Sequence, residues 1–182
     1  TVNALPIISV SSGSICAGQS YTIIANGAST YTSVPSLAGP IVTPTATTNY
    51  SITGTDTNGC VSSNTVVSSV IVNALPSISV NSGSICVGQS FTMIPSGADT
   101  YTYSNGSSVA TPTANATYSI SGTNTVTGCV SNVDAVSSVS VNVLPSISVN
   151  SGSICAGQSF TMVPNGASTY TYSSGSAVVT PS

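Results

Sequence analysis

Apolar and polar positions alternate along this 182-residue chain in short runs that recur. The runs are clearest in the middle of the chain, where the alternating residues are Ile78 and Val80, Phe91 and Met93, Tyr101 and Tyr103, Tyr118 and Ile120, and Val139, Val141 and Val143. A period of two is typical of β-strands with one buried face. No long window has the period of an amphipathic helix, so the pattern predicts an all-β fold.

Turn signals separate these runs. Ser82-Gly83, Asn105-Gly106, Pro112 and Thr127-Gly128 fall between them, and Asn58-Gly59 is a strong hairpin signal in the first part of the chain. Short strands with turns at this spacing predict β-sandwich domains of immunoglobulin type.

The whole pattern repeats. Val2-Asn3-Ala4-Leu5-Pro6 returns almost unchanged at residues 72–76 and 141–145. Residues 72–112 and 141–181 differ at only 8 of 41 positions, so the chain is a tandem array of one unit.

We therefore expect three immunoglobulin-like repeats, at residues 1–71, 72–140 and 141–182, which we call repeats 1, 2 and 3. The third is expected to be incomplete, in a segment of a longer protein. The linker Ala74-Leu75-Pro76 is short, and proline fixes one backbone angle. These features predict a stiff, rod-like array.

Composition narrows the function. The chain has no Lys, Arg, His or Glu, and its only charges are Asp56, Asp99 and Asp134, for a net charge of −3. Without cations it has no means to neutralise phosphates, and no stretch approaches the roughly 20 apolar residues of a membrane span. A catalytic serine would lack a base, and the three Asp residues fall at different positions of the repeat. We expect no enzyme, cofactor, metal, nucleic acid or membrane insertion.

The cysteines follow the repeat. Three occur in Ser-Ile-Cys-x-Gly-Gln-Ser and two in Gly-Cys-Val-Ser; in these two contexts they are Cys16, Cys86 and Cys155, then Cys60 and Cys129. We expect one disulfide per repeat, Cys16–Cys60 and Cys86–Cys129. Each bond should stabilise its repeat by roughly 4 kcal/mol. Disulfides also indicate an oxidising, extracellular compartment. Cys155 is unpaired in this segment, with its expected partner beyond Ser182. A metal site needs three or four ligands, which two cysteines and no histidine disfavour.

Motif order adds a resemblance. Ser-Ile-Cys-Ala-Gly-Gln-Ser (14–20) and Gly-Ala-Ser-Thr-Tyr-Thr (27–32) precede residues 44–60 and Val70-Ile71-Val72-Asn73-Ala74-Leu75-Pro76. This order and spacing resemble the PKD-like and immunoglobulin-like repeats of very large secreted surface proteins of Bacteroidota. The resemblance implies tandem PKD-like sandwiches, export by the type IX route, a cell-surface location, and a role in adhesion, gliding or surface structure.

Two groups of residues are candidates for binding or modification. Tyr101 and Tyr103 recur as Tyr170 and Tyr172 on one strand face, where exposed rings would stack on sugars and packed rings would belong to the core. We favour packing in the core, and Ser33 at the second place in repeat 1 argues against a repeated sugar site. The Asn-x-Ser/Thr triplets offer glycan acceptors at Asn49, Asn105 and Asn115.

The favoured function is a structural component of an extracellular filament or stalk. Sandwich edges are usually guarded by charge, and this chain has almost none, so copies of the chain are its expected partners. The alternative is a spacer or carbohydrate-binding accessory module of a large adhesin or secreted enzyme, with surface glycans as partners. A functional amyloid is a third hypothesis, against which the long repeat and the paired cysteines argue.

Overall fold

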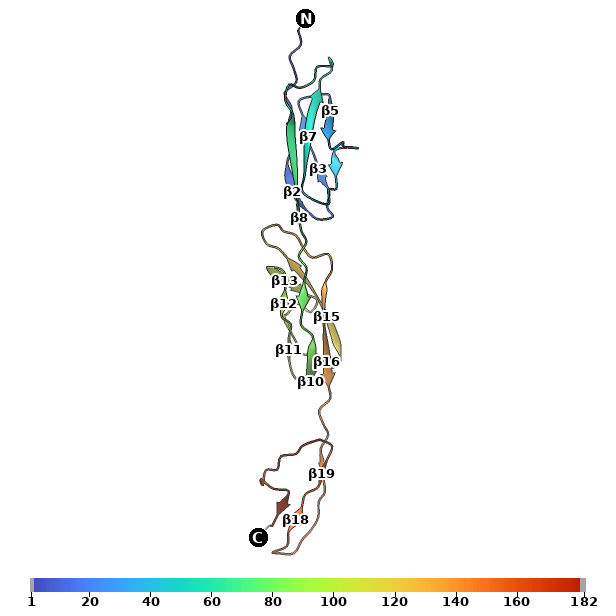
Figure 1. The fold of residues 1–182 in the computed structure, drawn as a ribbon. Coiled ribbons are helices and arrows are strands. Elements are labelled where there is room, and N and C mark those ends of the chain that lie inside the picture. The colour runs from blue at the N-terminus through green and yellow to red at the C-terminus, as the bar shows by residue number, and fades with distance from the viewer. Residues whose placement is uncertain (1, 181–182) are drawn as a thin grey trace. The chain divides into compact units, whose positions relative to one another are not determined.

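The structure is a computed structural model that describes residues 2–180. By compactness the chain divides into two units: residues 1–82, 92–109 and 117–138 form the first, and residues 83–91, 110–116 and 139–182 form the second. All regular structure in the described part of the chain is β-strand (Figure 1). The four-stranded sheets follow the sequence repeats, so each repeat is described by itself.

Repeat 1 contains eight strands. They are β1 (Ser9–Val10), β2 (Gly13–Cys16), β3 (Tyr21–Thr22), β4 (Ala25–Asn26), β5 (Thr30–Val34), β6 (Ile41–Val42), β7 (Thr48–Thr55) and β8 (Val66–Asn73). One layer is a four-stranded sheet in the order β2-β8-β7-β5, in which β2 runs parallel to β8 and the other pairs are antiparallel. The other layer consists of the pairs β1-β4 and β3-β6.

The core of repeat 1 lies between these layers. The four-stranded sheet contributes Ile15, Tyr50, Ile52 and Val70, and the other layer contributes Ile23 and Val42. All are nearly buried, as a sandwich with alternating inward residues requires. The fold is therefore the predicted all-β, immunoglobulin-like sandwich.

The first strand of the sandwich changes layers. Only Ser11 and Ser12 separate β1, which pairs with β4, from β2, which pairs with β8. The fully buried hydroxyl of Ser68 on β8 donates to the Ser11 carbonyl at 2.7 Å. The Ser69 amide donates to Ser12 Oγ at 3.0 Å. These two hydrogen bonds from β8 fix the crossover of the first strand between layers.

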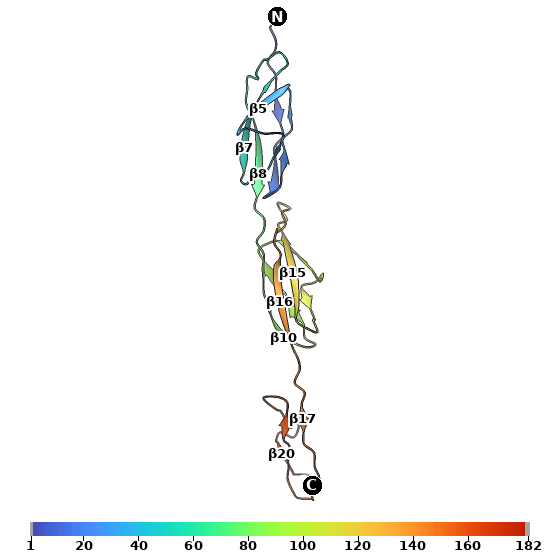
Figure 2. The ribbon, with the colours of Figure 1, turned by 90° about the vertical axis from the view of Figure 1, so that its right-hand side faces the viewer.

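Repeat 2 has the same strands. They are β9 (Ser79–Val80), β10 (Gly83–Cys86), β11 (Phe91–Thr92), β12 (Pro95–Ser96), β13 (Thr100–Tyr103), β14 (Val109–Ala110), β15 (Ala116–Thr123) and β16 (Ala135–Asn142). The large sheet has the equivalent order β10-β16-β15-β13, and Figure 2 shows β15, β16 and β10 side by side. Ile85, Met93, Ile120 and Val139 fill the equivalent core.

Repeat 3 retains only the smaller layer. Its strands are β17 (Ser148–Val149), β18 (Phe160–Thr161), β19 (Pro164–Asn165) and β20 (Val178–Val179). They form the antiparallel pairs β17-β19 and β18-β20. Residues 152–155, which repeat the sequence of β2 and β10, are not a strand.

Most of the sequence-based strands are confirmed. The runs near Val80, Phe91, Tyr101, Ile120 and Val139 correspond to β9, β11, β13, β15 and β16. Val143 lies outside β16, and the turn predicted at Ser82-Gly83 is wrong, because Gly83 is the first residue of β10. The repeat boundaries and a rod-like arrangement of the repeats stay predictions.

Candidate functional site

The first cysteine of each complete repeat lies where the chain leaves that repeat. Cys16 is the last residue of β2 and pairs in register with Asn73, the last residue of β8. The next amide, Ala17 N, donates to the Asn73 carbonyl at 2.9 Å. The chain then continues through Ala74-Leu75-Pro76 into repeat 2. The parallel pairing of β2 and β8 therefore positions Cys16 beside the linker.

A tight turn fixes this cysteine and explains its motif. Gln19 accepts a hydrogen bond from Cys16 N through Oε1 at 3.2 Å and donates from its own amide to the Cys16 carbonyl at 3.0 Å. Gly18 has φ of 86°, a conformation that favours glycine. Gly and Gln in Ser-Ile-Cys-x-Gly-Gln-Ser thus hold the cysteine backbone in place.

The second cysteine lies in the loop between the two long strands. In repeat 1 this loop joins β7 to β8, and Asp56 organises it. Asp56 Oδ1 accepts hydrogen bonds from Asn58 N and Cys60 N, both at 2.8 Å. The hydrogen bond from the Cys60 amide is the main cause of a lowered pKa for the Asp56 carboxyl.

Repeat 2 builds a similar loop that is one residue longer before its cysteine, with Asn124 where repeat 1 has Asp56. Asn124 Oδ1 accepts from the amides of Val126 and Thr127, each at 3.0 Å. Thr127 Oγ1 accepts from Cys129 N at 3.3 Å. Asp99 contributes from a neighbouring loop, where its Oδ2 accepts from Thr125 N at 2.8 Å. Two of the three Asp residues therefore support second-cysteine loops.

The two cysteines of one repeat lie at opposite ends of the same sheet. Cys16 is level with Asn73 at the end of β8, whereas Ile52, which precedes the Cys60 loop, is level with Val66 at its start. The seven residue steps between Val66 and Asn73 correspond to about 23 Å. A disulfide allows no more than roughly 7 Å between its Cα atoms. The predicted Cys16–Cys60 bond is therefore wrong for this fold.

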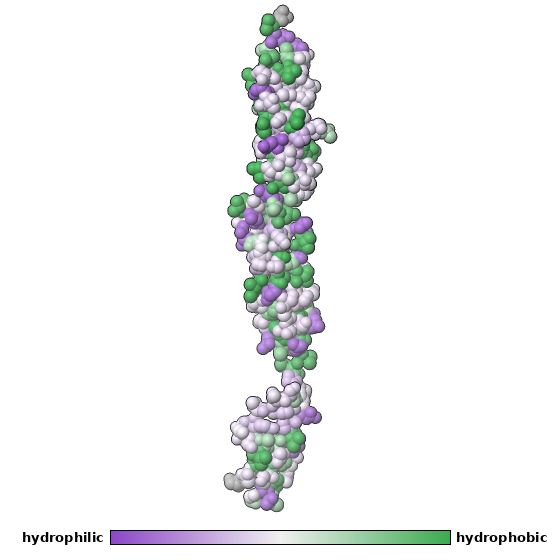
Figure 3. Space-filling model, viewed as in Figure 1, coloured by the Kyte–Doolittle hydropathy of each residue, from purple (hydrophilic) through white to green (hydrophobic). Residues whose placement is uncertain are grey.

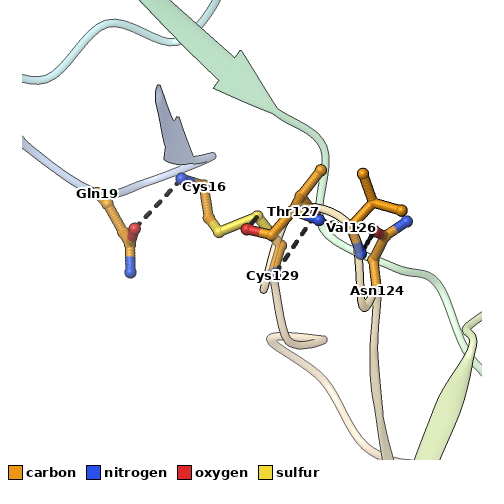
Figure 4. Close-up of a disulfide and its surroundings, with 6 residues drawn as sticks. All are labelled: Cys16, Gln19, Asn124, Val126, Thr127 and Cys129. Carbon is orange, nitrogen blue, oxygen red and sulfur yellow. Dashed lines mark hydrogen bonds between the residues drawn. A yellow bond between two sulfur atoms is a disulfide. The ribbon is translucent and has the colours of Figure 1, made fainter. Parts of the chain in front are cut away.

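The structure instead joins Cys16 to Cys129, with a Cα–Cα distance of 5.6 Å and a sequence separation of 113 residues (Figure 4). Both residues belong to the first compact unit, although they come from repeats 1 and 2. The sulfur of Cys129 is thereby used, so the predicted Cys86–Cys129 bond is also wrong. Cys60, Cys86 and Cys155 carry no disulfide within residues 2–180.

A disulfide is typical of an oxidising, extracellular compartment. This one also changes what the cysteines do. A bond within a repeat would stabilise one sandwich. Cys16–Cys129 instead gives two sandwiches a second covalent connection, in addition to the peptide linker.

The tyrosines that were candidates for sugar stacking are half-buried. Tyr101 Oη donates to the Ala98 carbonyl at 2.7 Å and accepts from Ala98 N at 3.0 Å. Tyr31 makes the same pair of bonds with Ala28 and packs against the core of repeat 1. Tyr103, Tyr170 and Tyr172 are likewise only partly exposed. The hydroxyls of Tyr31 and Tyr101 therefore anchor a loop, and Tyr31 is the one of these rings shown to pack against a core. Core packing of the Tyr101 and Tyr103 rings stays a prediction.

The three glycan-acceptor candidates are exposed but differ in their contacts. Asn115 Oδ1 accepts from Val141 N at 2.7 Å and so holds the end of β16. Asn105 bonds weakly within its own turn, and Asn49 projects from β7 with no side-chain hydrogen bond to a described residue. Glycosylation at these positions stays a prediction.

The described residues form concave surfaces, of which two are relevant here. A groove of about 680 Å³ in repeat 1 is lined by residues 29–33 and 36–40 with Ile23, Ala25 and Ile52, and no charged group lines it. A second one, of about 320 Å³, lies over Met162 and Tyr172 in repeat 3. In the described range, no three potential metal ligands gather, and no helix could span a membrane.

Comparisons with known proteins assign no family. No family model matches the chain, and no curated protein matches it. Among solved structures, the chain is similar to fibronectin(III)-like modules of Clostridium thermocellum CbhA, at 13% identity over 75% of this chain and 95% of that one, with a TM-score of 0.35.

Two cell-adhesion proteins are also similar. The N-terminal eight immunoglobulin domains of Down Syndrome Cell Adhesion Molecule align at 14% identity over 89% of this chain and 32% of theirs, with a TM-score of 0.29. Cadherin domains 1–4 of Protocadherin Gamma B7 align at 11% identity over 87% and 59%, with a TM-score of 0.30. At these TM-scores the likeness assigns no function.

Proposed function

We propose that this chain is a structural segment of an extracellular filament or stalk, in which successive sandwich repeats are braced by disulfides and copies associate through their surfaces. The observation that carries the proposal is the Cys16–Cys129 disulfide between residues of two repeats. A second covalent connection beside the linker limits how far the two repeats can separate. That property suits a protein that transmits force, and a flexible chain of modules does not need it.

Recurring exposed apolar side chains support association between copies. Ile24, Ile94 and Val163 occupy the same place in the three repeats and are 57%, 69% and 62% exposed. Val67 and Val136 on the last long strands are a second exposed pair. On the face drawn in Figure 3, hydrophobic patches are scattered among pale residues of intermediate hydropathy and smaller hydrophilic patches. Without Lys or Arg, this surface offers little charge repulsion to a neighbouring copy.

Repeat 3 also has uncovered apolar residues. Ile154 is 38% exposed, whereas the equivalent Ile15 and Ile85, on β2 and β10 of the four-stranded sheets, are 8% exposed. Two strands equivalent to β7 and β8 would cover it. In the proposed assembly these come from further repeat sequence or from another copy, through backbone pairing and apolar packing without ion pairs.

Electron microscopy of the native material, together with force–extension measurements on single fibres, tests this function. Ordered fibres of constant diameter would support it, and reduction with a thiol should lower the force at which single fibres extend or break. Isolated flexible strings, with the same extension behaviour before and after reduction, would contradict it. That result would favour the spacer role on a large adhesin or enzyme. Binding of soluble glycans to the isolated chain would favour a carbohydrate-binding accessory role.

A further inference from the structure

We propose that the two cysteines of every repeat serve two different junctions: the first bonds to the second cysteine of the repeat that follows. Cys16–Cys129 is one such bond. Cys86 is then the first half of the next bond, and Cys60 is the second half of the preceding one. Their partners are cysteine thiols in the complementary sequence context. This pairing does not depend on the proposed filament function, because it would hold equally if the repeats were spacers.

The local structure around Cys86 matches that around the bonded Cys16. Cys86 ends β10 level with Asn142 on β16, as Cys16 is level with Asn73 on β8. Gln89 Oε1 accepts from Cys86 N at 3.0 Å, and Gln89 N donates to the Cys86 carbonyl at 3.0 Å. The Val87 amide donates to the Asn142 carbonyl at 2.9 Å. Cys86 therefore lies beside the linker that leaves repeat 2.

Cys60 corresponds in the same way to the bonded Cys129. Each follows a positive-φ glycine, Gly59 at 81° and Gly128 at 71°. The carbonyls of Cys60 and Cys129 accept from Asp56 N at 3.0 Å and Asn124 N at 2.9 Å. Each loop also forms a bridge to the preceding long strand, Thr55 to Val61 in repeat 1 and Thr123 to Val130 in repeat 2. The loop therefore holds the Cys60 backbone as it holds that of Cys129, although the Cys60 amide donates to Asp56 Oδ1 and the Cys129 amide to Thr127 Oγ1. Cys60 is partly exposed and carries no disulfide within residues 2–180.

The fold excludes a disulfide between the two cysteines of the same repeat. Cys86 is level with the end of β16, and Cys129 follows β15 at the opposite end of the same sheet, so repeat 2 repeats the separation of about 23 Å found in repeat 1. A repeat with both cysteine types therefore cannot use them on each other. It has one thiol for each neighbour.

The chemistry is a two-electron oxidation. The two thiols lose two protons and two electrons, and one sulfur–sulfur bond forms. The oxidant is a small disulfide compound, whose sulfur–sulfur bond is broken in the exchange. One cysteine thiolate attacks this compound and forms a mixed disulfide, and the second cysteine thiolate attacks the mixed disulfide. The two sulfurs of the oxidant leave as thiols and carry away the two protons and two electrons. Both free halves are accessible to exchange, since Cys60 and Cys86 are partly exposed.

Disulfide mapping of the full-length native protein tests the inference. The protein is isolated without reductant, free thiols are blocked with N-ethylmaleimide, and the chain is digested with proteases that do not require Lys or Arg. Cys86 should appear linked to a peptide with a Gly-Cys-Val-Ser-type cysteine, and Cys60 to one with a Ser-Ile-Cys-type cysteine. Each linked pair should weigh two hydrogen atoms less than its two peptides. The Cys16–Cys129 pair is the internal control.

The mass of the unreduced protein shows whether the partner cysteines belong to the same chain or to another copy. A denatured, unreduced protein with the mass of one polypeptide places both partners in the same chain. A ladder of multiples that collapses on reduction places them in another copy. Either result supports the complementary pairing. Maleimide-blocked Cys60 and Cys86, Cys16 linked to Cys60, or pairs between two cysteines of the same context would each overturn it.

Discussion

Repeats 2 and 3 have nearly the same sequence over residues 72–112 and 141–181, yet only one of them forms a complete sandwich. Residues 83–86 are strand β10, whereas the identical Gly152-Ser153-Ile154-Cys155 is not a strand. Ile85 is 8% exposed and Ile154 is 38% exposed. The difference therefore does not come from these residues.

The missing element is the distant strand. β10 is held by parallel pairing with β16, some fifty residues later in the chain, and repeat 3 has no described equivalent of β15 or β16. The hairpin-like pairs that need only nearby residues, β17-β19 and β18-β20, persist in repeat 3. The smaller layer therefore forms locally, and the layer that ends in a cysteine depends on non-local pairing.

Truncation of the core methionine should separate the two repeats most clearly. Met93 is 1% exposed, and Met93→Ala should destabilise repeat 2 by about 2–5 kcal/mol through lost burial and a cavity. Met162 is partly exposed beside the open face of repeat 3, so Met162→Ala should cost much less. Hydrogen exchange of peptides from each repeat measures both effects. Equal losses in the two repeats would mean that repeat 3 packs as well as repeat 2.

A side chain added at the start of β10 should have the next largest effect. A Cβ at Gly83 would lie 2.7 Å from Cε2 of Phe91, whose ring covers this glycine. Gly83→Val should destabilise repeat 2 by about 1–3 kcal/mol through overpacking. The matched Gly152→Val should cost less, although its Cβ would be 2.9 Å from Phe160, because no large sheet fixes that segment. Amide exchange of β16 should report the first change, and a silent Gly83→Val variant would contradict the packing.

The buried serine of β16 should have a moderate effect. Ser137 Oγ donates to the Asn81 carbonyl at 2.7 Å at the point where the first strand changes layers. Ser137→Ala leaves that carbonyl without this donor and should cost about 1 kcal/mol. Ser140→Ala, on the exposed face of the same strand, should be nearly neutral. Denaturant unfolding of the two variants compares them, and equal midpoints would show that the hydrogen bond does not stabilise the crossover.

The smallest expected effect distinguishes the second-cysteine loops of repeats 1 and 2. The folded-state pKa of Asp56 is below the ordinary 3.8, because the ionised carboxyl accepts the Cys60 amide. Its contribution is present above pH 3.8 and is lost as pH falls through the lower folded pKa. The amide shifts of Asn58 and Cys60 should therefore titrate with a midpoint below 3.8. Asp56→Asn, which imitates Asn124, should remove this transition, and a midpoint at or above 3.8 would refute the role of the carboxylate.

The sequence predicted strands with one buried face, and it predicted the hairpin turn before Cys60. Alternation at Tyr118 and Ile120 located β15, and Asn58-Gly59 located the turn before Cys60, where Gly59 has a φ of 81°. These features are local: side-chain period and glycine conformation are visible in a few consecutive residues.

The disulfide could not be predicted in the same way, because it depends on a parallel pair of strands. Ser82-Gly83 was interpreted as a turn, although Gly83 begins β10 and Phe91 covers it. Without that strand, nothing in the sequence places Cys86 at the opposite end of the sheet from Cys129. The recurring Gly and Gln after each first cysteine were the available signal of a fixed turn, but they do not indicate which neighbour it faces.

The central claim is that the cysteines brace one repeat to the next, and thiol mapping of the 182-residue chain and two variants tests it most directly. In the oxidised parent, Cys16 and Cys129 should be found in one disulfide. Cys16→Ser should expose a new thiol at Cys129 and leave the labelling of Cys60 unchanged, and Cys129→Ser should expose Cys16 and leave Cys86 unchanged. Release of Cys60 by Cys16→Ser, or of Cys86 by Cys129→Ser, would show that each repeat closes on itself and would contradict the account.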